Sequence, residues 1–364
     1  MNRTMTVVAL LGAVLPWAAP LRAQWQPERS GTTAELRALL AVSERVVWAA
    51  GRGGVFARTL DGGATWRSDT VPGAGALFFV GVAATGADTA WLAGTSFADS
   101  IPDARLYRTV DGGRSWRLQW RSTRVGIFLD GVRCWDARRA VAFGDALDGR
   151  MLVLSTSNAG ASWTRADSAS IPPALPGEAG FAASGTALAV SRVGARGGRG
   201  ERLLAWIGTG GGGRARVYRT RDGGRSWSVA ATSMPAGATA GMFGVAFRDE
   251  RHGTAVGGDY SRPRVPGALA LRTGDGGGTW TPAGPAAPAG VRYGVAYVPG
   301  TGTPTLMAVG PSGSGYSTDD GGSWTVADTV AYNTVSFATA SAGWAAGPDG
   351  RIARWRGRWP VRRP

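Results

Sequence analysis

The chain has 364 residues, with 58 glycines, 16 tryptophans, one cysteine, one histidine and 40 basic against 25 acidic side chains. One cysteine excludes an intramolecular disulfide and a thiolate zinc site, and one histidine excludes a histidine-rich metal centre, so we expect no metal and no cofactor. The net charge of +15 would favour binding to a polyanion such as nucleic acid, but all 40 basic residues are arginine in a chain rich in glycine and alanine. This indicates a compositional bias, and we expect no specific nucleic-acid partner.

The first 23 residues have the pattern of a secretory signal peptide. Arg3 is followed by an apolar stretch over residues 5–15, a break at Pro16 and a small residue at Ala23. The apolar stretch is shorter than the ~20 residues that cross a bilayer, and no later stretch is long enough. We therefore expect export to the periplasm or the extracellular space and a single domain over residues 24–364. Leu21 stands where cleavage prefers a small residue, so an uncleaved anchor is the alternative.

One short motif dominates the rest of the sequence and occurs six times. It consists of Ser or Thr, any residue, Asp, any residue, Gly, any residue, Ser or Thr, and Trp. Its acidic and aromatic members are Asp61 and Trp66, Asp111 and Trp116, Asp222 and Trp227, Asp275 and Trp280, and Asp319 and Trp324, while the third copy has Asn158 with Trp163. Together with Trp25 and Trp359, these tryptophans divide the chain into seven units of 35 to 64 residues.

Each unit has the pattern of four short strands. The first is an apolar stretch such as residues 244–247, and the second ends in glycine, as at residues 48–51. The third, such as residues 55–59, leads into the motif, and the Trp opens the fourth. The motif therefore lies in a hairpin turn, where its carboxylate can accept backbone N–H groups and its glycines supply positive φ. Because Asn158 retains the acceptor oxygen, we expect a structural role for the motif.

These units predict an all-β fold, a seven-bladed β-propeller of four-stranded antiparallel blades. The last unit has a third strand at residues 351–355 but no Asp motif after it, while Trp25 opens a fourth strand without a preceding hairpin. We therefore predict that the N-terminal and C-terminal strands complete one blade. Two glycine-rich runs, residues 192–202 and 208–216, lengthen the fourth unit and are predicted to be flexible insertions.

The six motifs resemble the Asp-box, or bacterial neuraminidase repeat, over essentially all of residues 24–364. Within that class, residues 108–113 and 344–350 are similar to segments of the photosystem II stability and assembly factor-like propellers. Members of this family in photosynthetic organisms are lumenal assembly chaperones and not enzymes, and the resemblance implies a similar role here. We therefore expect a monomeric, non-enzymatic scaffold that binds an unknown protein of the cell envelope.

Two enzyme classes remain as alternatives. Asp-boxes are also typical of sialidases and other glycoside-acting propellers, but the sequence lacks their Phe-Arg-Ile-Pro-like segment, and only Tyr260 stands close to Asp259, Arg262 and Arg264. A Ser-His-Asp triad would have to use His252, which lies in a predicted turn. A quinone-cofactor dehydrogenase is the other class, although no cofactor site is evident. A central pocket with clustered Arg, Tyr and paired carboxylates would favour an enzyme, and a broad charged face a scaffold.

Two groups of residues are candidates for partner binding. The loops after the second strands share one face of a propeller, where function usually lies, and their candidates are Asp99, Asp145, Asp148, Asp259, Tyr260, Arg262 and Arg264. The second group is the basic C-terminal segment, with Arg354, Arg356 and Arg358. A further set of arginines precedes the motif in five units, and we expect each to contact a carboxylate or carbonyl: Arg58, Arg108, Arg219, Arg272 and Arg354.

Overall fold

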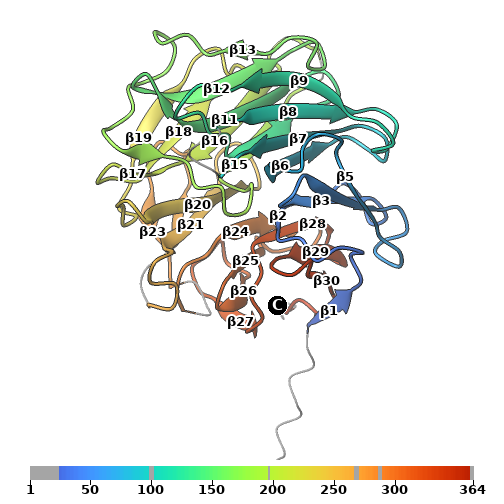
Figure 1. Cartoon of the computed structure of the whole chain (residues 1–364). Coiled ribbons are helices and arrows are strands. Elements are labelled where there is room, and N and C mark those ends of the chain that lie inside the picture. The colour runs from blue at the N-terminus through green and yellow to red at the C-terminus, as the bar shows by residue number, and fades with distance from the viewer. Residues whose placement is uncertain (1–23, 98–101, 196, 266–269, 286–288, 361–364) are drawn as a thin grey trace, which may run out of the picture.

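The computed structural model describes residues 24–97, 102–195, 197–265, 270–285 and 289–360. These residues contain strands and no helix. The strands form seven antiparallel sheets, which are arranged around a common centre (Figure 1). The chain is a seven-bladed β-propeller, as the repeats predict.

In the first four blades the strands follow one another in chain order from the centre outwards. Blade 1 has β2 (Leu36–Ala41), β3 (Val47–Gly51), β4 (Val55–Thr59) and β5 (Arg67–Thr70); blade 2 has β6 (Phe78–Ala84), β7 (Ala90–Thr95), β8 (Ala104–Thr109) and β9 (Arg117–Ser122). Blade 3 has β10 (Gly131–Cys134), β11 (Ala140–Leu147), β12 (Arg150–Thr156) and β13 (Thr164–Arg165); blade 4 has β15 (Leu188–Val193), β16 (Arg202–Gly208), β18 (Arg216–Thr220) and β19 (Ser228–Ala231).

The remaining blades follow the same plan with two additions. Blade 5 has β20 (Ala240–Phe247), β21 (Gly253–Asp259), β22 (Ala270–Thr273) and β23 (Thr281–Pro282), and two short strands, β14 (Glu178–Ala179) and β17 (Gly210–Gly211), extend it at its inner edge. Blade 6 has β24 (Gly294–Tyr297), β25 (Leu306–Gly310), β26 (Gly313–Ser317) and β27 (Thr325–Asp328). Blade 7 has β28 (Thr334–Thr339), β29 (Ala342–Ala346), β30 (Ile352–Trp355) and, outermost, β1 (Trp25–Glu28).

The ring is closed by the two ends of the described chain. The innermost strands β2, β6, β10, β15, β20, β24 and β28 contact one another in that order, and β28 contacts β2. In blade 7, β1 pairs antiparallel with β30, so that Trp25 lies opposite Trp355 and Glu28 opposite Ile352. This is the pairing of terminal strands that the sequence predicts.

The core lies between neighbouring blades. Within the described residues, seven apolar clusters each join two adjacent blades. The second strand of a blade supplies much of this core, and all residues of β3, β7 and β29 are buried. A glycine at or near the end of such a strand is needed because backbone packs against it: a Cβ at Gly51, the last residue of β3, would lie 2.0 Å from the carbonyl oxygen of Glu35, and one at Gly144 in β11 would lie 1.8 Å from that of Phe128.

The six motif turns, here called Asp turns, are closed by their own side chains. In the first, the hydroxyl of Thr59 accepts from the N–H of Gly63 at 2.9 Å and donates to Asp61 at 2.8 Å. Asp61 also accepts from the N–H of Thr65 at 2.9 Å and from its hydroxyl at 2.5 Å. The hydrogen bonds from Thr65 and Thr59 lower the pKa of Asp61 to about 2, so the carboxylate is ionised and already supplied with donors.

The third Asp turn has the same shape with an amide in place of the carboxylate. The side-chain oxygen of Asn158 accepts from the N–H of Ser162 at 3.0 Å, and its NH₂ group donates to the Ser162 hydroxyl at 2.9 Å. The Asn158 amide therefore makes the hydrogen bonds to Ser162 that close this turn, without a negative charge.

Arginines on the third strands join one blade to the next. Arg354 in blade 7 donates to the carbonyl of Gly62 in blade 1 at 2.6 Å, and Arg58 in blade 1 donates to the carbonyl of Ala87 in blade 2 at 2.5 Å. Each of these two guanidinium groups also lies 5.1 Å from the centroid of a buried Trp ring in its own blade. Contacts to a carboxylate or carbonyl were expected for five such arginines. They are seen for Arg58, Arg354 and Arg219, which donates to the carbonyl of Gly276 at 3.4 Å. Arg108 differs, because its Nε is buried without a partner among the described residues and its guanidinium lies 5.0 Å from the ring centroid of Trp91.

The connection between β16 and β18 of blade 4 differs from its sequence-based interpretation. Residues 208–216 were predicted to be a flexible insertion, but β17 pairs with β14 on one side and β20 on the other. The buried carboxylate of Glu178 in β14 forms an ion pair with Arg216 and accepts from the hydroxyl of Thr209 at 2.6 Å. These contacts hold the segment that continues into residues 179–183, which line a pocket.

Candidate binding site at the mouth of the central cavity

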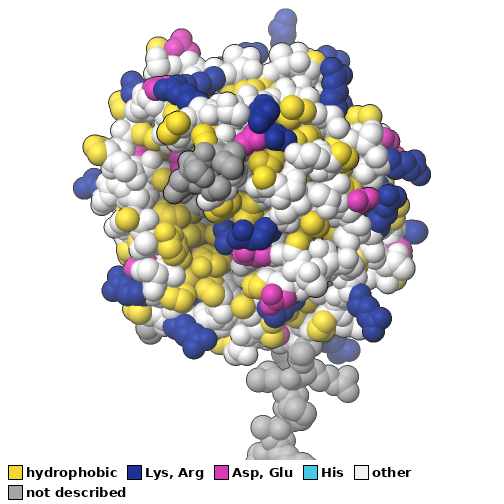
Figure 2. Space-filling model, viewed as in Figure 1, with side chains coloured by type: hydrophobic (Ala, Val, Ile, Leu, Met, Phe, Trp, Pro, Cys, Tyr) yellow, Lys and Arg dark blue, Asp and Glu magenta, His cyan; other side chains and the backbone are white. Residues whose placement is uncertain are grey.

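The propeller has two distinct faces. The turn face carries the six Asp turns and the turns between the first and second strands of each blade. The pocket face carries the loops after the second strands and the connections between blades. A pocket of about 390 Å³ opens here at the end of the central cavity. Figure 2 shows hydrophobic side chains gathered around a hollow next to β20 and β24, two strands at one side of this pocket.

Aromatic rings form two walls of the pocket. On one side, Phe243 lies with its ring centroid 4.5 Å from Phe181, 6.3 Å from Tyr260 and 5.4 Å from Tyr293. On the other side, the rings of Phe97 and Phe128 are 5.2 Å apart in an edge-on arrangement. The walls come from blades 2, 3, 5 and 6, so the ring brings together residues that are far apart in the sequence.

Between the walls lie two carboxyl groups from blade 3. Asp130 precedes β10, is 1% exposed, and has no hydrogen-bond donor at either carboxylate oxygen among the described residues. Asp145 in β11 faces it and accepts from the N–H of Gly180 at 2.8 Å. Gly180 packs closely against Asp130, since a Cβ at this position would lie 2.2 Å from Asp130 Oδ2.

The surroundings of the two carboxyl groups favour their protonated forms. Burial raises the pKa of Asp130 well above its usual range, and the adjacent charge of Asp145 raises it further. Burial also raises the pKa of Asp145 to about 6. The carboxylate oxygens of Asp130 and Asp145 that face each other are both acceptors. They can form a hydrogen bond only when one of the two groups carries a proton, which the pair then shares.

Arg37 is the cation at the edge of this pocket, and its charge is already balanced. Its Nε donates to Glu35 at 2.8 Å, and a second nitrogen donates to the carbonyl of Ala182 at 3.4 Å. Its guanidinium lies 4.8 Å from the ring centroid of Phe78 and 5.8 Å from that of Phe97. The pocket therefore already packs one cationic group against aromatic faces.

The structure places the predicted partner-binding residues at different sites. Asp145 and Tyr260 line the pocket. Asp148 lies apart from it in ion pairs with Arg124 and Arg165, and Asp259 accepts from Thr239, Ser261 and Arg262. Arg264 is exposed on the same face. Asp99 lies outside the described residues.

The predicted C-terminal group lies on the turn face, opposite the pocket. Arg354 is half-buried in its contact with blade 1, Arg356 donates to the side chain of Gln26 at 2.8 Å, and Arg358 is exposed. Trp359 donates to the carbonyl of Ala340 at 2.7 Å, which fixes this segment beside the turn between β28 and β29. The two predicted groups therefore cannot contribute to one site.

Most residues of the pocket were not predicted from the sequence. These are Arg37, Phe97, Phe128, Asp130, Phe181, Phe243 and Tyr293. Several stand at or just before the start of a first strand, which is the position nearest the propeller axis on this face. A comparison of the seven units at that position would have drawn attention to the single buried carboxylate, because Asp130 is the acidic residue there that lacks a donor.

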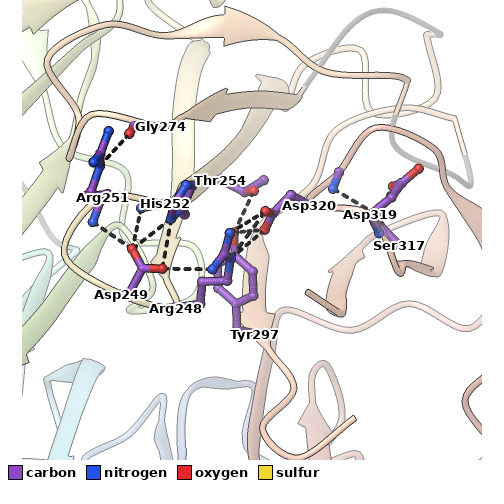
Figure 3. Close-up of polar contacts among 11 residues, drawn as sticks. Arg248, Asp249, Arg251, His252, Thr254, Gly274, Tyr297, Ser317, Asp319 and Asp320 are labelled. Carbon is purple, nitrogen blue, oxygen red and sulfur yellow. Dashed lines mark hydrogen bonds and ion pairs between the residues drawn. The ribbon is translucent and has the colours of Figure 1, made fainter. Parts of the chain in front are cut away.

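A second polar network lies on the turn face between blades 5 and 6 (Figure 3). The His252 ring contacts Asp249 at 2.8 Å, Arg248 contacts Asp249 at 2.8 Å and Asp320 at 2.9 Å, and the Tyr297 hydroxyl donates to Asp320 at 2.8 Å. Through Arg248, Tyr297 and Asp320 the network joins the two blades, and no serine hydroxyl of the described chain bonds to His252.

Comparison with known proteins supports the fold. No family model and no curated protein matches the sequence. A solved structure of YCF48 bound to D1 peptide matches with a TM-score of 0.61 at 16% identity, over 92% of this chain and 97% of that chain. YCF48 from Cyanidioschyzon merolae matches with a TM-score of 0.61 at 18% identity, over 92% and 99%. In architecture, the chain resembles YCF48.

An enzyme shares the same architecture. The GH74 xyloglucanase from Xanthomonas campestris matches with a TM-score of 0.61 at 18% identity, over 92% of this chain and 54% of the enzyme. At such identities the likeness to YCF48 and to the enzyme establishes the propeller fold alone. No helix among the described residues is long and apolar enough to cross a membrane.

Proposed function

We propose that this protein is a non-enzymatic scaffold that binds a polypeptide segment of a partner in the pocket on the pocket face. The observation that carries the proposal is the pair of aromatic walls enclosing about 390 Å³ around polar groups. Apolar walls with a few fixed polar groups are the usual composition of a site that binds side chains of a partner.

Two further observations support this function. The structurally similar YCF48 is seen bound to a D1 peptide, which demonstrates peptide binding by a propeller of this shape. The residues over the pocket, 179–183, are held by the buried pair of Glu178 and Arg216, so the site is largely formed before a ligand binds. The pattern of residues 1–23 further suggests export, and we propose a partner in the cell envelope.

A glycoside-acting enzyme is the second candidate, because Arg37, Tyr260, Tyr293 and two carboxyl groups share one pocket and a GH74 enzyme shares the fold. The geometry of the carboxyl groups argues against it. Glycosidases hold their two carboxyls at least ~5 Å apart to leave room for the sugar or a water. Here Asp130 and Asp145 are in hydrogen-bonding contact, and Asp130 is fully buried.

The test is to select peptides from a displayed library of random 12-residue sequences on the purified protein. Peptides that bind the wild type should lose at least 10-fold in affinity for Ala238→Trp, since Ala238 is exposed at the pocket and the larger side chain fills it. Arg358→Ala on the turn face is the matched control and should bind normally. Selected peptides that bind both variants equally, or hydrolysis of xyloglucan or aryl glycosides by the wild type, would contradict the proposal.

A further inference from the structure

We propose that the pocket binds an organic cation, an alkylammonium or guanidinium group, with Asp130 and Asp145 as its anionic partner. Where the ligand is a peptide, this inference rests on the proposed function and specifies that the bound segment inserts a lysine or arginine side chain between the aromatic walls. It assigns a role to the one buried carboxyl group of the pocket that the fold leaves without a donor.

The first argument is the unpaired state of Asp130. Buried acceptors are nearly always satisfied, because each one left without a donor costs free energy. Asp130 is 1% exposed, lines the pocket, and has no N–H or hydroxyl donor at either oxygen within the described chain, so its one donor is the proton that it shares with Asp145. Its conformation is fixed by the bond from its own N–H to the carbonyl of Phe143 at 2.9 Å and by close packing against Gly180. A ligand with N–H donors would supply what the protein does not.

The second argument is the chemistry of the walls. The faces of aromatic rings are electron-rich and attract cations, most strongly where water is excluded. Phe181, Phe243, Tyr260 and Tyr293 face the pocket from one side, and Phe97 and Phe128 from the other. Arg37 demonstrates the same recognition within the protein, because its guanidinium lies 4.8 Å from the centroid of Phe78.

The third argument is the charge of the pocket. The titratable groups that line it are Arg37, Asp130, Asp145, Tyr260 and Tyr293. Arg37 is paired with Glu35 at 2.8 Å, Glu35 also contacts Arg52 at 3.5 Å, and burial raises the pKa of Tyr293. The carboxyl pair therefore sets the net charge, which is −1 with one shared proton and −2 without it. An anionic ligand would meet this charge with no free cation to balance it.

Binding should be linked to proton release. A cation placed between the carboxyl groups takes over the role of the shared proton and favours the ionised pair, so the complex holds fewer protons than the free protein. Because the pKa of Asp145 is raised to about 6, affinity for the cation should increase from pH 5 to pH 8. A neutral ligand of the same shape should show no such increase.

The experiment compares hexylammonium with 1-hexanol, two probes that share an alkyl chain and differ in charge. Isothermal titration calorimetry on the full-length protein should give at least 10-fold tighter binding of hexylammonium at pH 8, with protons released to the buffer. Asp130→Asn should remove that preference and leave hexanol binding unchanged. Asp148→Asn, an exposed aspartate on the same face outside the pocket, is the matched control and should behave as the wild type.

Each outcome separates this inference from the proposed function. If the wild type binds both probes equally, or if Asp130→Asn weakens both equally while circular dichroism shows an intact fold, the cation site is wrong, and peptides selected at the pocket would still support the scaffold. If hexylammonium is preferred but no peptide is selected, the cation site is correct and the polypeptide partner is wrong. Failure of both sets of experiments would overturn both proposals.

Discussion

On the turn face, Asp222 accepts hydrogen bonds from the backbone N–H groups of Arg225 and Ser226 and from the hydroxyls of Thr220 and Ser226, whereas on the pocket face Asp130 accepts none. The side chain is the same in both places and the surroundings differ. Hydrogen-bond donors that converge on a carboxylate lower its pKa, so the ionised group stabilises the turn. A buried carboxyl group without donors destabilises the folded state once it ionises. Asp130 therefore does not serve stability, which points to an interaction with a ligand.

The largest expected effect is the loss of an Asp turn. Asp222→Ala removes the acceptor of four donors in the turn between β18 and β19 of blade 4, and we expect a loss of about 3 kcal/mol in the free energy of unfolding, since bonds to charged groups are worth about 1.5–3 kcal/mol. Urea denaturation followed by tryptophan fluorescence measures it. Asp222→Asn is the control and should lose less, because Asn158 fills the same position in the third turn. Equal losses for both would show that charge, not acceptor geometry, stabilises the turn.

The next effect has the opposite sign and depends on pH. The raised pKa of the pocket carboxyls means that the folded state binds protons more tightly than the unfolded state, so their contribution to stability is present below about pH 4 and is lost as pH rises through about 6. Asp130→Asn removes one ionising group and should make the protein more stable at pH 8 by on the order of 2 kcal/mol, with little change at pH 4.

Urea denaturation of Asp130→Asn and the wild type at both pH values tests this. The same measurement on Asp148→Asn is the control for the removal of an acidic side chain on the same face. A variant that is less stable than the wild type at pH 8 would mean that Asp130 has a stabilising partner, and the comparison between the two faces would then fail.

The smallest effect is expected at the third Asp turn. Asn158→Asp would restore the carboxylate found in the other five turns and allow it to accept from both the N–H and the hydroxyl of Ser162. We expect a gain of about 0.5 kcal/mol at pH 7. Because donors lower the pKa of such a carboxylate, as in Asp61, the gain should vanish as pH falls from about 4 to about 2. Differential scanning calorimetry at pH 7 and pH 2.5 measures it, and a gain that persists at pH 2.5 would contradict the explanation.

The fold was predictable from the sequence because the repeats expose it directly. Six motifs at hairpin turns, glycine-ended second strands and the unpaired end strands at Trp25 and Trp355 are local patterns, and each has a local physical cause. The glycine of the second strand, for example, is fixed by contact with a backbone carbonyl, as Gly51 is by Glu35.

The pocket was mostly not predictable, because it is assembled from one or two residues of each of several blades. Phe97, Asp130 and Tyr293 are ordinary residues within their own units and become a site only when the ring brings them together. Asp145 and Tyr260 were predicted from their place after a second strand, but their partners lie before first strands. The error at residues 208–216 has a similar cause, since a glycine-rich run becomes ordered when β14, from a distant part of the chain, pairs with it.

The pairing of β1 with β30 also determines which rearrangements of the chain the molecule should tolerate. The first and the last described strands both belong to blade 7. The ring should therefore form equally well if the chain began at another blade, provided that neighbouring blades stay neighbours. A short linker from residue 360 to residue 24, combined with new ends in the exposed loop near Val125, would produce a circular permutant that retains every strand pairing. In such a permutant blade 7 would be formed from a continuous stretch of chain, and the pocket would keep the same walls.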